Sequence, residues 1–357
     1  MPLSTSTASS AELALRAARD AGFEALVASS PATVRWLLRG RGRPVDAAAP
    51  EAAYTLVLTD DGAAALFPDI EAPRVEGEER LDEVGFEPVP YPWHEGPAEA
   101  IRSAAGARKV ACDAELEPAL APLRRTLSPE ELDRYRAAGA DCADAVRAAL
   151  GALRPEAAER DAAAALAAEA RRRGFFPPVV LVAGERRQPV HRHPLPTASP
   201  LGRHALLAVT AEREGLHVSM TRLVSFGPPP AELARLAAAA ARVDAAMLQA
   251  SRPGTTLGDV LAIAAAAYDA EGFSQEWRRH HQGGLTGYRG REAFAVPGSE
   301  VEIPVRAAVA WNPSITGGAK SEDTALVTAD GVEVVTRTSD LPEIETAGLA
   351  RPGIVVL

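Results

Sequence analysis

Residues 191–222, HRHPLPTASPLGRHALLAVTAEREGLHVSMTR, contain the clearest indication of the fold of this chain. Its apolar segment Ala205–Thr210 and its alternating segment His217–Val224 are typical of two neighbouring β-strands. The segment Glu212–Gly215 carries the turn that would join them. The rest of the second half of the chain is expected to build on this strand pair.

Polar side chains gather on and before the same strand pair. Because side chains alternate across a strand, His217, Ser219 and Thr221 should share one face. Two further histidines, His191 and His193, precede the first strand. A histidine-rich segment beside a polar strand face and a very apolar strand predicts a pocket at this strand pair.

Composition limits the class of protein. The chain has 357 residues, of which 47% are hydrophobic and 24% are charged, so it should be globular with two domains. The net charge is −10, and no basic stripe is visible, which argues against a nucleic-acid partner. Cys112 and Cys142 are too few for a disulfide framework or a zinc site. Without a signal-peptide pattern or a membrane-length apolar run, we expect a cytoplasmic protein with no membrane partner.

A change of composition marks the domain boundary. Strands alternate with helices over residues 1–127, which predicts a small α/β N-terminal domain. At LeuSerProGluGluLeu (127–132) long Ala-rich helices begin, with Ser128 as the expected N-cap. We therefore place a second domain at residues 128–340 and a C-terminal tail at residues 341–357.

The expected elements of the N-terminal domain can be read from apolar runs and turn residues. They are helices at Ala11–Ala21, Ala32–Leu38 and Pro97–Ala105, an apolar run at Ala25–Ala28, a hairpin of Tyr54–Thr59 and Ala63–Phe67, and strands at Phe86–Tyr91 and Lys109–Cys112.

The second domain contains an internal repeat. Two helix pairs begin at Glu131-Leu132 and Glu232-Leu233, and four residues of each half match at one constant offset. This pattern predicts two helix–helix–sheet halves related by a pseudo-twofold axis, with a pocket between them on the concave side of the sheet. The matching residues are Pro155, Asp161, Gly174 and Phe175 in the first half, and Pro253, Asp259, Gly272 and Phe273 in the second.

Candidate chemistry clusters in the second domain, which holds six of the seven histidines. His280 and His281 open a Gly-rich loop, and Glu322 begins an apolar strand. A neutral imidazole beside a carboxylate is the usual acid–base pair near neutral pH. Structural roles for single histidines and a metal site are the alternatives, although no HExxH motif or compact ligand cluster is present in the sequence.

This layout resembles the creatinase/aminopeptidase family, whose members share the pita-bread fold. The similarity covers about residues 128–337, and the segment ASSPATVRWL (28–37) is similar to the N-terminal domain of the Xaa-Pro aminopeptidase/prolidase/creatinase branch. The resemblance implies an α+β protein, with pseudo-twofold helix pairs on a curved antiparallel sheet, preceded by the smaller α/β domain.

The metallopeptidases of that family carry five metal ligands, and the resemblance implies that this chain keeps only one, Glu322. The family's ProHisTyrArg-like motif corresponds to ProValHisArg, which contains His191. A site for two divalent cations needs several anionic oxygens, so we expect no metal cofactor. At the other four ligand positions the chain has Ala208, Ser219, Gly284 and Asn312.

The resemblance then implies a metal-independent, creatinase-like hydrolase that acts on a C–N bond of a small polar substrate. His191 would be the general acid and base, and Glu322 would bind or orient the substrate. Arg222 or an arginine of the N-terminal domain would meet a substrate carboxylate. The expected substrate-binding residues are His280, His281, Gln282, Tyr288, Arg222 and His217.

Two alternatives stay open. In the first alternative to this hydrolase, the chain is a catalytically inactive pseudo-peptidase that binds a peptide or small ligand. In the second, it is a metal-dependent Xaa-Pro aminopeptidase or prolidase in which histidines replace the lost ligands. Members of this branch are usually homodimers in which the N-terminal domain reaches the partner's pocket. Arg35, Arg39 and Arg41 are the candidates for that role.

Overall fold

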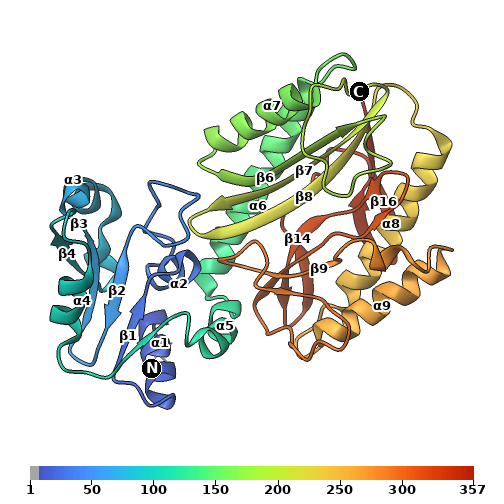
Figure 1. Cartoon of the computed structure of the whole chain (residues 1–357). Coiled ribbons are helices and arrows are strands. Elements are labelled where there is room, and N and C mark those ends of the chain that lie inside the picture. Colours follow the sequence, from blue (N-terminus) through green and yellow to red (C-terminus); the bar gives the residue numbers. More distant parts are fainter. Residues whose placement is uncertain (1–7) are drawn as a thin grey trace, which may run out of the picture. The chain divides into compact units, whose positions relative to one another are not determined.

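The computed structural model describes residues 8–357 and divides them into two compact units, one ending at Arg124 and one comprising Arg125–Leu357 (Figure 1). This division falls three residues before the boundary that the sequence suggested. The tail that we separated at residue 341 lies within the second unit.

The N-terminal unit is built on one five-stranded sheet with the order β4-β3-β2-β1-β5. Val57, Leu66 and Ala105 form a buried cluster where α4 packs on the sheet. The strands are β1 (Ala25–Ala28), β2 (Thr55–Leu58), β3 (Ala63–Pro68), β4 (Glu87–Tyr91) and β5 (Val110–Cys112). The helices are α1 (Ser10–Asp20), α2 (Pro31–Leu37), α3 (Ala72–Arg74), α4 (Ala98–Ala105) and α5 (Glu117–Arg125).

The second unit contains two helix pairs, as the repeat predicts. The pairs are α6 (Pro129–Gly151) with α7 (Glu159–Arg172), and α8 (Ala231–Ala250) with α9 (Leu257–Ala270). Ser128 caps α6 by accepting a hydrogen bond from the Glu131 N–H at 3.2 Å. Each second helix is followed by a glycine with positive φ, 79° at Gly174 and 83° at Gly272, and then by a phenylalanine.

The sheets of this unit also form two halves. One sheet has the order β18-β8-β7-β6 and the other β10-β9-β11-β14-β15. Helices α6 and α7 pack on the first sheet, and α8 and α9 pack on the second (Figure 1). The strands are β6 (Phe176–Gly184), β7 (His204–Arg213), β8 (Leu216–Ser225), β9 (Gly283–Thr286), β10 (Ala293–Phe294), β11 (Ala307–Trp311), β14 (Asp323–Thr328), β15 (Gly331–Val334) and β18 (Ile354–Val356). Two short hairpins are β12 (Ser314–Ile315) with β13 (Ala319–Lys320), and β16 (Glu343–Thr346) with β17 (Leu349–Pro352).

The strand pair that the sequence singled out is confirmed as β7 and β8, which pair antiparallel along their whole length. Glu214 (φ 51°) and Gly215 (φ 81°) form the turn between them. At the other edge of β8, the Thr221 N–H donates to the Glu322 carbonyl at 3.0 Å, which brings β8 of the first half beside β14 of the second.

Strand β6 was not predicted from the sequence, because Pro177 and Pro178 interrupt it. Proline lacks the N–H that a sheet ladder needs, and strands tolerate it mainly at edges and irregularities. Here β6 is the edge strand, and its register with β7 shifts between Phe176 and Val179, at the two prolines.

Buried ion pairs hold the tail in the second unit. The Arg351 guanidinium on β17 donates to Asp244 of α8 at 2.7 Å and to Asp323 of β14 at 2.9 Å. Arg222 of β8 donates to the other oxygen of Asp323 at 2.9 Å. After this junction, β18 pairs parallel with β8. The apolar end of the chain therefore docks on its own unit.

No helix within residues 8–357 is long and apolar enough to span a membrane.

Candidate functional site

A cavity of about 320 Å³ lies in the second unit between its two halves. The first half contributes β6, β7, β8 and the loop that precedes β7, and the second half contributes the segments around β9, β10 and β13. The residues lining it are Pro178, Val179, Leu181, His193, Ala208, Val209, Thr210, His217, His281, Gly290, Arg291, Phe294, Asn312, Lys320 and Glu322. Its position agrees with the pocket predicted from the repeat.

Glu322 is the only carboxylate among the described residues that line the cavity, and its oxygens are already engaged. Its Oε2 accepts from the Thr221 hydroxyl at 2.6 Å and lies 3.0 Å from Lys320 Nζ. Its Oε1 lies 3.4 Å from Arg291 Nη2. Two cations thus share one buried carboxylate.

Arg291 reaches this cluster from the segment between β9 and β10. Its Nη1 donates to the Gly290 carbonyl at 2.6 Å, and the Ser219 hydroxyl lies 3.4 Å away. Its Nε is buried and has no hydrogen-bond partner among the described residues. The guanidinium therefore retains one donor that neither Glu322 nor Ser219 uses.

Glu322, Lys320 and Arg291 form what we call the cavity floor. The net charge of this floor follows from their contacts. Burial raises the pKa of Glu322, but Lys320, Arg291 and the Thr221 hydrogen bond outweigh it and leave that pKa below its usual value. Burial lowers the pKa of Arg291, although a guanidinium stays protonated in proteins. At neutral pH the floor carries two positive charges against one negative charge, and it favours an anionic ligand.

His217 presents an oriented imidazole to the cavity. Its Nδ1 lies 3.1 Å from the Gly287 carbonyl. Because a carbonyl only accepts hydrogen bonds, Nδ1 must carry the hydrogen, and Nε2 carries the lone pair of the neutral ring. A neutral imidazole fixed in this way can accept a proton at Nε2.

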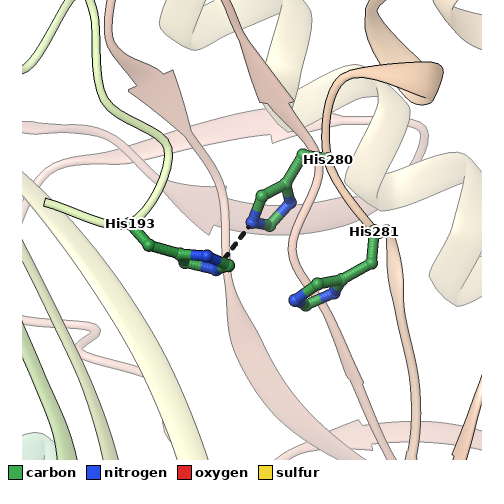
Figure 2. A group of neighbouring side chains, drawn as sticks. All are labelled: His193, His280 and His281. Atoms are coloured by element: carbon green, nitrogen blue, oxygen red, sulfur yellow. Dashed lines mark hydrogen bonds between the residues drawn. The ribbon is translucent and has the colours of Figure 1, made fainter.

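Three other histidines form a cluster at the cavity, His193 from the loop before β7 and His280 and His281 from the segment before β9 (Figure 2). One nitrogen from each ring lies within 4.8 Å of the others. The Nε2 atoms of His193 and His280 are 2.9 Å apart, and the rings of His280 and His281 stack with centroids 4.4 Å apart. We call these three residues the histidine trio.

All three imidazoles of the trio are neutral near pH 7. Burial, followed by the charge of Lys320, lowers the pKa of His193 and lowers the pKa of His280 to about 2. Burial and then Arg291 lower the pKa of His281 to about 4. Each ring therefore keeps a nitrogen lone pair at neutral pH.

The structure does not place His191 where its predicted role as acid and base would require. His191 is exposed and lines a separate, very small pocket with Gln188 and Arg192. His193, two residues later, lines the cavity instead. The segment at residues 185–190 is a series of turns, so strand alternation could not tell the two histidines apart.

Of the other predicted site residues, Glu322, His217 and His281 line the cavity, and His280 adjoins it through the trio. The remaining three have structural partners. Gln282 Nε2 donates to the His280 carbonyl at 2.6 Å, the Tyr288 hydroxyl donates to Glu131 at 2.6 Å, and Arg222 pairs with Asp323 at 2.9 Å. Arg222 is therefore not the residue that meets a substrate at the floor.

The positions that the resemblance equates with metal ligands do not fit a two-metal centre. Ala208 and Asn312 line the cavity without a carboxylate. A Cβ atom on Gly284 would lie 2.0 Å from the Ala293 carbonyl oxygen, so no histidine fits there, and His281 supplies the imidazole nearby. The Glu322 carboxylate, the one ligand that the resemblance implies this chain keeps, is paired with Lys320 and Arg291.

Lys320 and Arg291 line the cavity but were not predicted from the sequence as site residues. A usable signal existed for Lys320, because it lies two residues before Glu322 and is one of only two lysines in the chain. Strand alternation would place both side chains on one face. Arg291 gave no comparable signal, since it follows an irregular segment.

Among the N-terminal arginines, Arg35 is buried, Arg39 adopts a positive φ of 52°, and Arg41 pairs with Glu83 at 3.0 Å. Their role at a partner's pocket and the homodimer itself stay predictions.

Comparison with known proteins identifies the family. The sequence model of metallopeptidase family M24 matches residues 133–329, more than half of the chain. No curated protein matches the sequence.

Solved structures show the same fold at low sequence identity. The crystal structure of dipeptidase PepE from Mycobacterium ulcerans is 21% identical, with a TM-score of 0.74 over 98% of this chain and 97% of that one. The prolidase from Pyrococcus horikoshii OT3 is 16% identical, with a TM-score of 0.71 over 92% and 98%. The N-terminal domain of FACT complex subunit SPT16 from chickpea is 12% identical, with a TM-score of 0.66 over 92% and 94%. The pita-bread fold is thereby confirmed, and the chain belongs to metallopeptidase family M24.

Proposed function

We propose that this protein is a hydrolase that cleaves a C–N bond in a small, carboxylate-bearing molecule without the two-metal centre of the family's peptidases. The observation that carries the proposal is the Lys320–Glu322–Arg291 cluster at a cavity of about 320 Å³. It supplies positive charge where a two-metal centre would need several carboxylates.

The substrate would be held by its own negative charge. Arg291 Nη2 and Lys320 Nζ lie 3.4 Å and 3.0 Å from Glu322, so a substrate carboxylate near both cations would be stabilised by charge-assisted hydrogen bonds. Glu322 then acts as a positioning residue that holds the two cations. This assignment replaces Arg222, which the structure commits to Asp323.

His217 would move the proton. A water oxygen attacks the carbon of the C–N bond while Nε2 of His217 accepts a proton from that water. When the C–N bond breaks, the imidazolium returns the proton to the leaving nitrogen, and a carboxylic acid and an amine result. His217 takes this role in place of His191, because it lines the cavity and its Nδ1–H is already held by Gly287.

A second candidate function is ligand binding without turnover. It is favoured by the contacts of Glu322, whose two oxygens are engaged by Thr221, Lys320 and Arg291 and offer little to a reacting group. A pseudo-peptidase would use the same cationic floor to hold a peptide carboxylate or a small acid.

A paired-substrate screen tests the proposal. Short dipeptides and N-acyl amino acids are compared with their carboxamide forms, in wild-type protein and in the His217→Gln and His94→Gln variants. His94 is an exposed histidine of the N-terminal unit and serves as the matched control. We expect turnover of carboxylate forms only, lost in His217→Gln and kept in His94→Gln.

Two results count against hydrolysis at this site. Turnover that is equal in both histidine variants would remove His217 from the mechanism. Binding of the carboxylate forms without product, measured by calorimetry on the same protein, would establish the ligand-binding function instead.

A further inference from the structure

We propose that the histidine trio binds one first-row transition-metal ion, with Zn²⁺ as the favoured ion. This ligand set differs from that of a two-metal centre, because it contains no carboxylate and none of its three residues stands at a position that the resemblance equates with a ligand, although the trio borders the same cavity. The inference goes beyond the proposed function, which does not depend on the ion.

The geometry of the trio suits one metal ion that is bound by a nitrogen of each of the three rings. Two tetrahedral Zn–N bonds of about 2.1 Å place their nitrogens roughly 3.4 Å apart. The trio nitrogens already lie within 4.8 Å of one another, and those of His193 and His280 within 2.9 Å. His193 and His281 are exposed, so side-chain rotation alone can adjust the remaining separations. Figure 2 shows the three rings turned toward the same region.

The hydrogen bonding of the buried imidazole of the trio, that of His280, differs from that of other histidines in this unit. The buried His204 has Gln188 Oε1 at 2.9 Å from its Nδ1, and His217 has the Gly287 carbonyl. In contrast, His280 is 8% exposed, its Nδ1 has no hydrogen-bond partner among the described residues, and its Nε2 meets only another imidazole. Buried polar side-chain atoms normally have a hydrogen-bond partner, and the buried Nδ1 of His280 has none among the described residues.

The ligand chemistry selects the ion. Three neutral imidazoles suit Zn²⁺, Co²⁺, Ni²⁺ or Cu²⁺, whereas Mg²⁺ and Ca²⁺ prefer oxygen ligands. Lys320 and Arg291 lie close enough to lower the pKa values of the trio, and this positive charge also disfavours a bare dication. We therefore expect an anion at the open coordination position and tighter metal binding when a carboxylate is present.

Metal titration of the full chain tests the site. Protein stripped with a chelator is titrated with Zn²⁺ by calorimetry and with Co²⁺ by visible absorption, which reports the geometry of the bound ion. We expect one equivalent of metal, with affinity reduced at least about tenfold in His280→Ala and in His281→Ala. His94→Ala and His191→Ala are the matched controls, and both should keep wild-type affinity.

Thermal unfolding of each metal-free variant checks that the fold is retained. Because His280 is buried and His281 is exposed, the His281→Ala variant keeps the test valid if His280→Ala is unstable. Either the absence of Zn²⁺ binding or equal affinity in wild-type, His193→Ala and His281→Ala proteins would overturn the proposal and leave the trio as a hydrogen-bonded, stacked group.

The test of metal binding can be distinguished from the test of hydrolysis. Hydrolysis is assayed in the same chelator-stripped and metal-loaded samples. Metal binding without turnover supports this inference and counts against hydrolysis, whereas turnover without metal binding does the reverse.

Discussion

Replacement of Glu322 by glutamine should destabilise the second unit strongly. The wild-type carboxylate is 4% exposed, with Lys320 Nζ 3.0 Å away and Arg291 Nη2 3.4 Å away. Glutamine keeps the shape and can still accept the Thr221 hydroxyl, but it leaves two buried cations without an anion. The change therefore isolates the loss of charge from the loss of volume.

The expected magnitude follows from the burial. Removal of one partner of a buried ion pair typically costs about 3–5 kcal/mol, because the other charge stays buried without compensation. For a unit of this size, each kcal/mol lowers Tm by about 2–4 °C, so Glu322→Gln should lower Tm by roughly 6–20 °C.

Differential scanning calorimetry at pH 7 measures this shift, with Glu333→Gln as the control. Glu333 pairs with Arg136 at 2.9 Å, but both side chains are more than 40% exposed, and such a pair contributes about 0–1 kcal/mol. Added acetate should raise the Tm of Glu322→Gln more than that of the wild type, since it can pair with the uncovered cations.

The pH dependence has a definite sign. The folded-state pKa of Glu322 lies below its ordinary value of 4.5, so its stabilising effect is complete above pH 4.5 and is lost as the pH falls through the lower folded value. The gap between wild-type and variant Tm should stay constant from pH 7 to pH 5. A Tm of Glu322→Gln equal to that of Glu333→Gln would refute the argument that two cations depend on this carboxylate.

Three further outcomes follow from local geometry. Gly284→Ala should destabilise the protein by about 3 kcal/mol or more in urea unfolding, because its Cβ would lie 2.0 Å from the Ala293 oxygen, whereas Gly151→Ala, with open space around it, should have little effect. Ser251→Ala should cost about 1–3 kcal/mol, since it removes the acceptor 2.8 Å from Trp311 Nε1 and leaves a buried indole N–H unpaired; unchanged urea unfolding would contradict this. Native protein should show one reactive thiol in a disulfide-exchange titration at pH 8, because Cys112 is exposed while burial raises the pKa of Cys142 to about 12, and two fast-reacting thiols would show that Cys142 is accessible.

Sequence patterns predicted the fold class and the two halves of the second unit, because these depend on periodic features. The β7–β8 pair followed from apolar runs and a glycine turn, and the two halves followed from one repeat offset. Strand β6 was missed because its prolines are acceptable only at the edge position that tertiary structure gives it.

The site was less predictable because it depends on contacts between distant segments. Alternation placed His217 correctly on β8, but it could not choose between His191 and His193 in a loop. The role of Arg291 depends on its meeting Glu322, 31 residues later in the chain. Tyr288 and Arg222 have polar side chains suited to a site, yet their partners Glu131 and Asp323 commit them to the structure.

We propose that the Lys320–Glu322–Arg291 cluster takes the place of the two-metal centre of the family's peptidases. The most direct test is the number of metal ions per chain, measured by elemental mass spectrometry after purification with manganese, cobalt and zinc present. We expect one ion per chain in wild-type protein, lost in His280→Ala and kept in His94→Ala. Two ions per chain in the wild type would contradict this expectation and would favour a dinuclear peptidase instead.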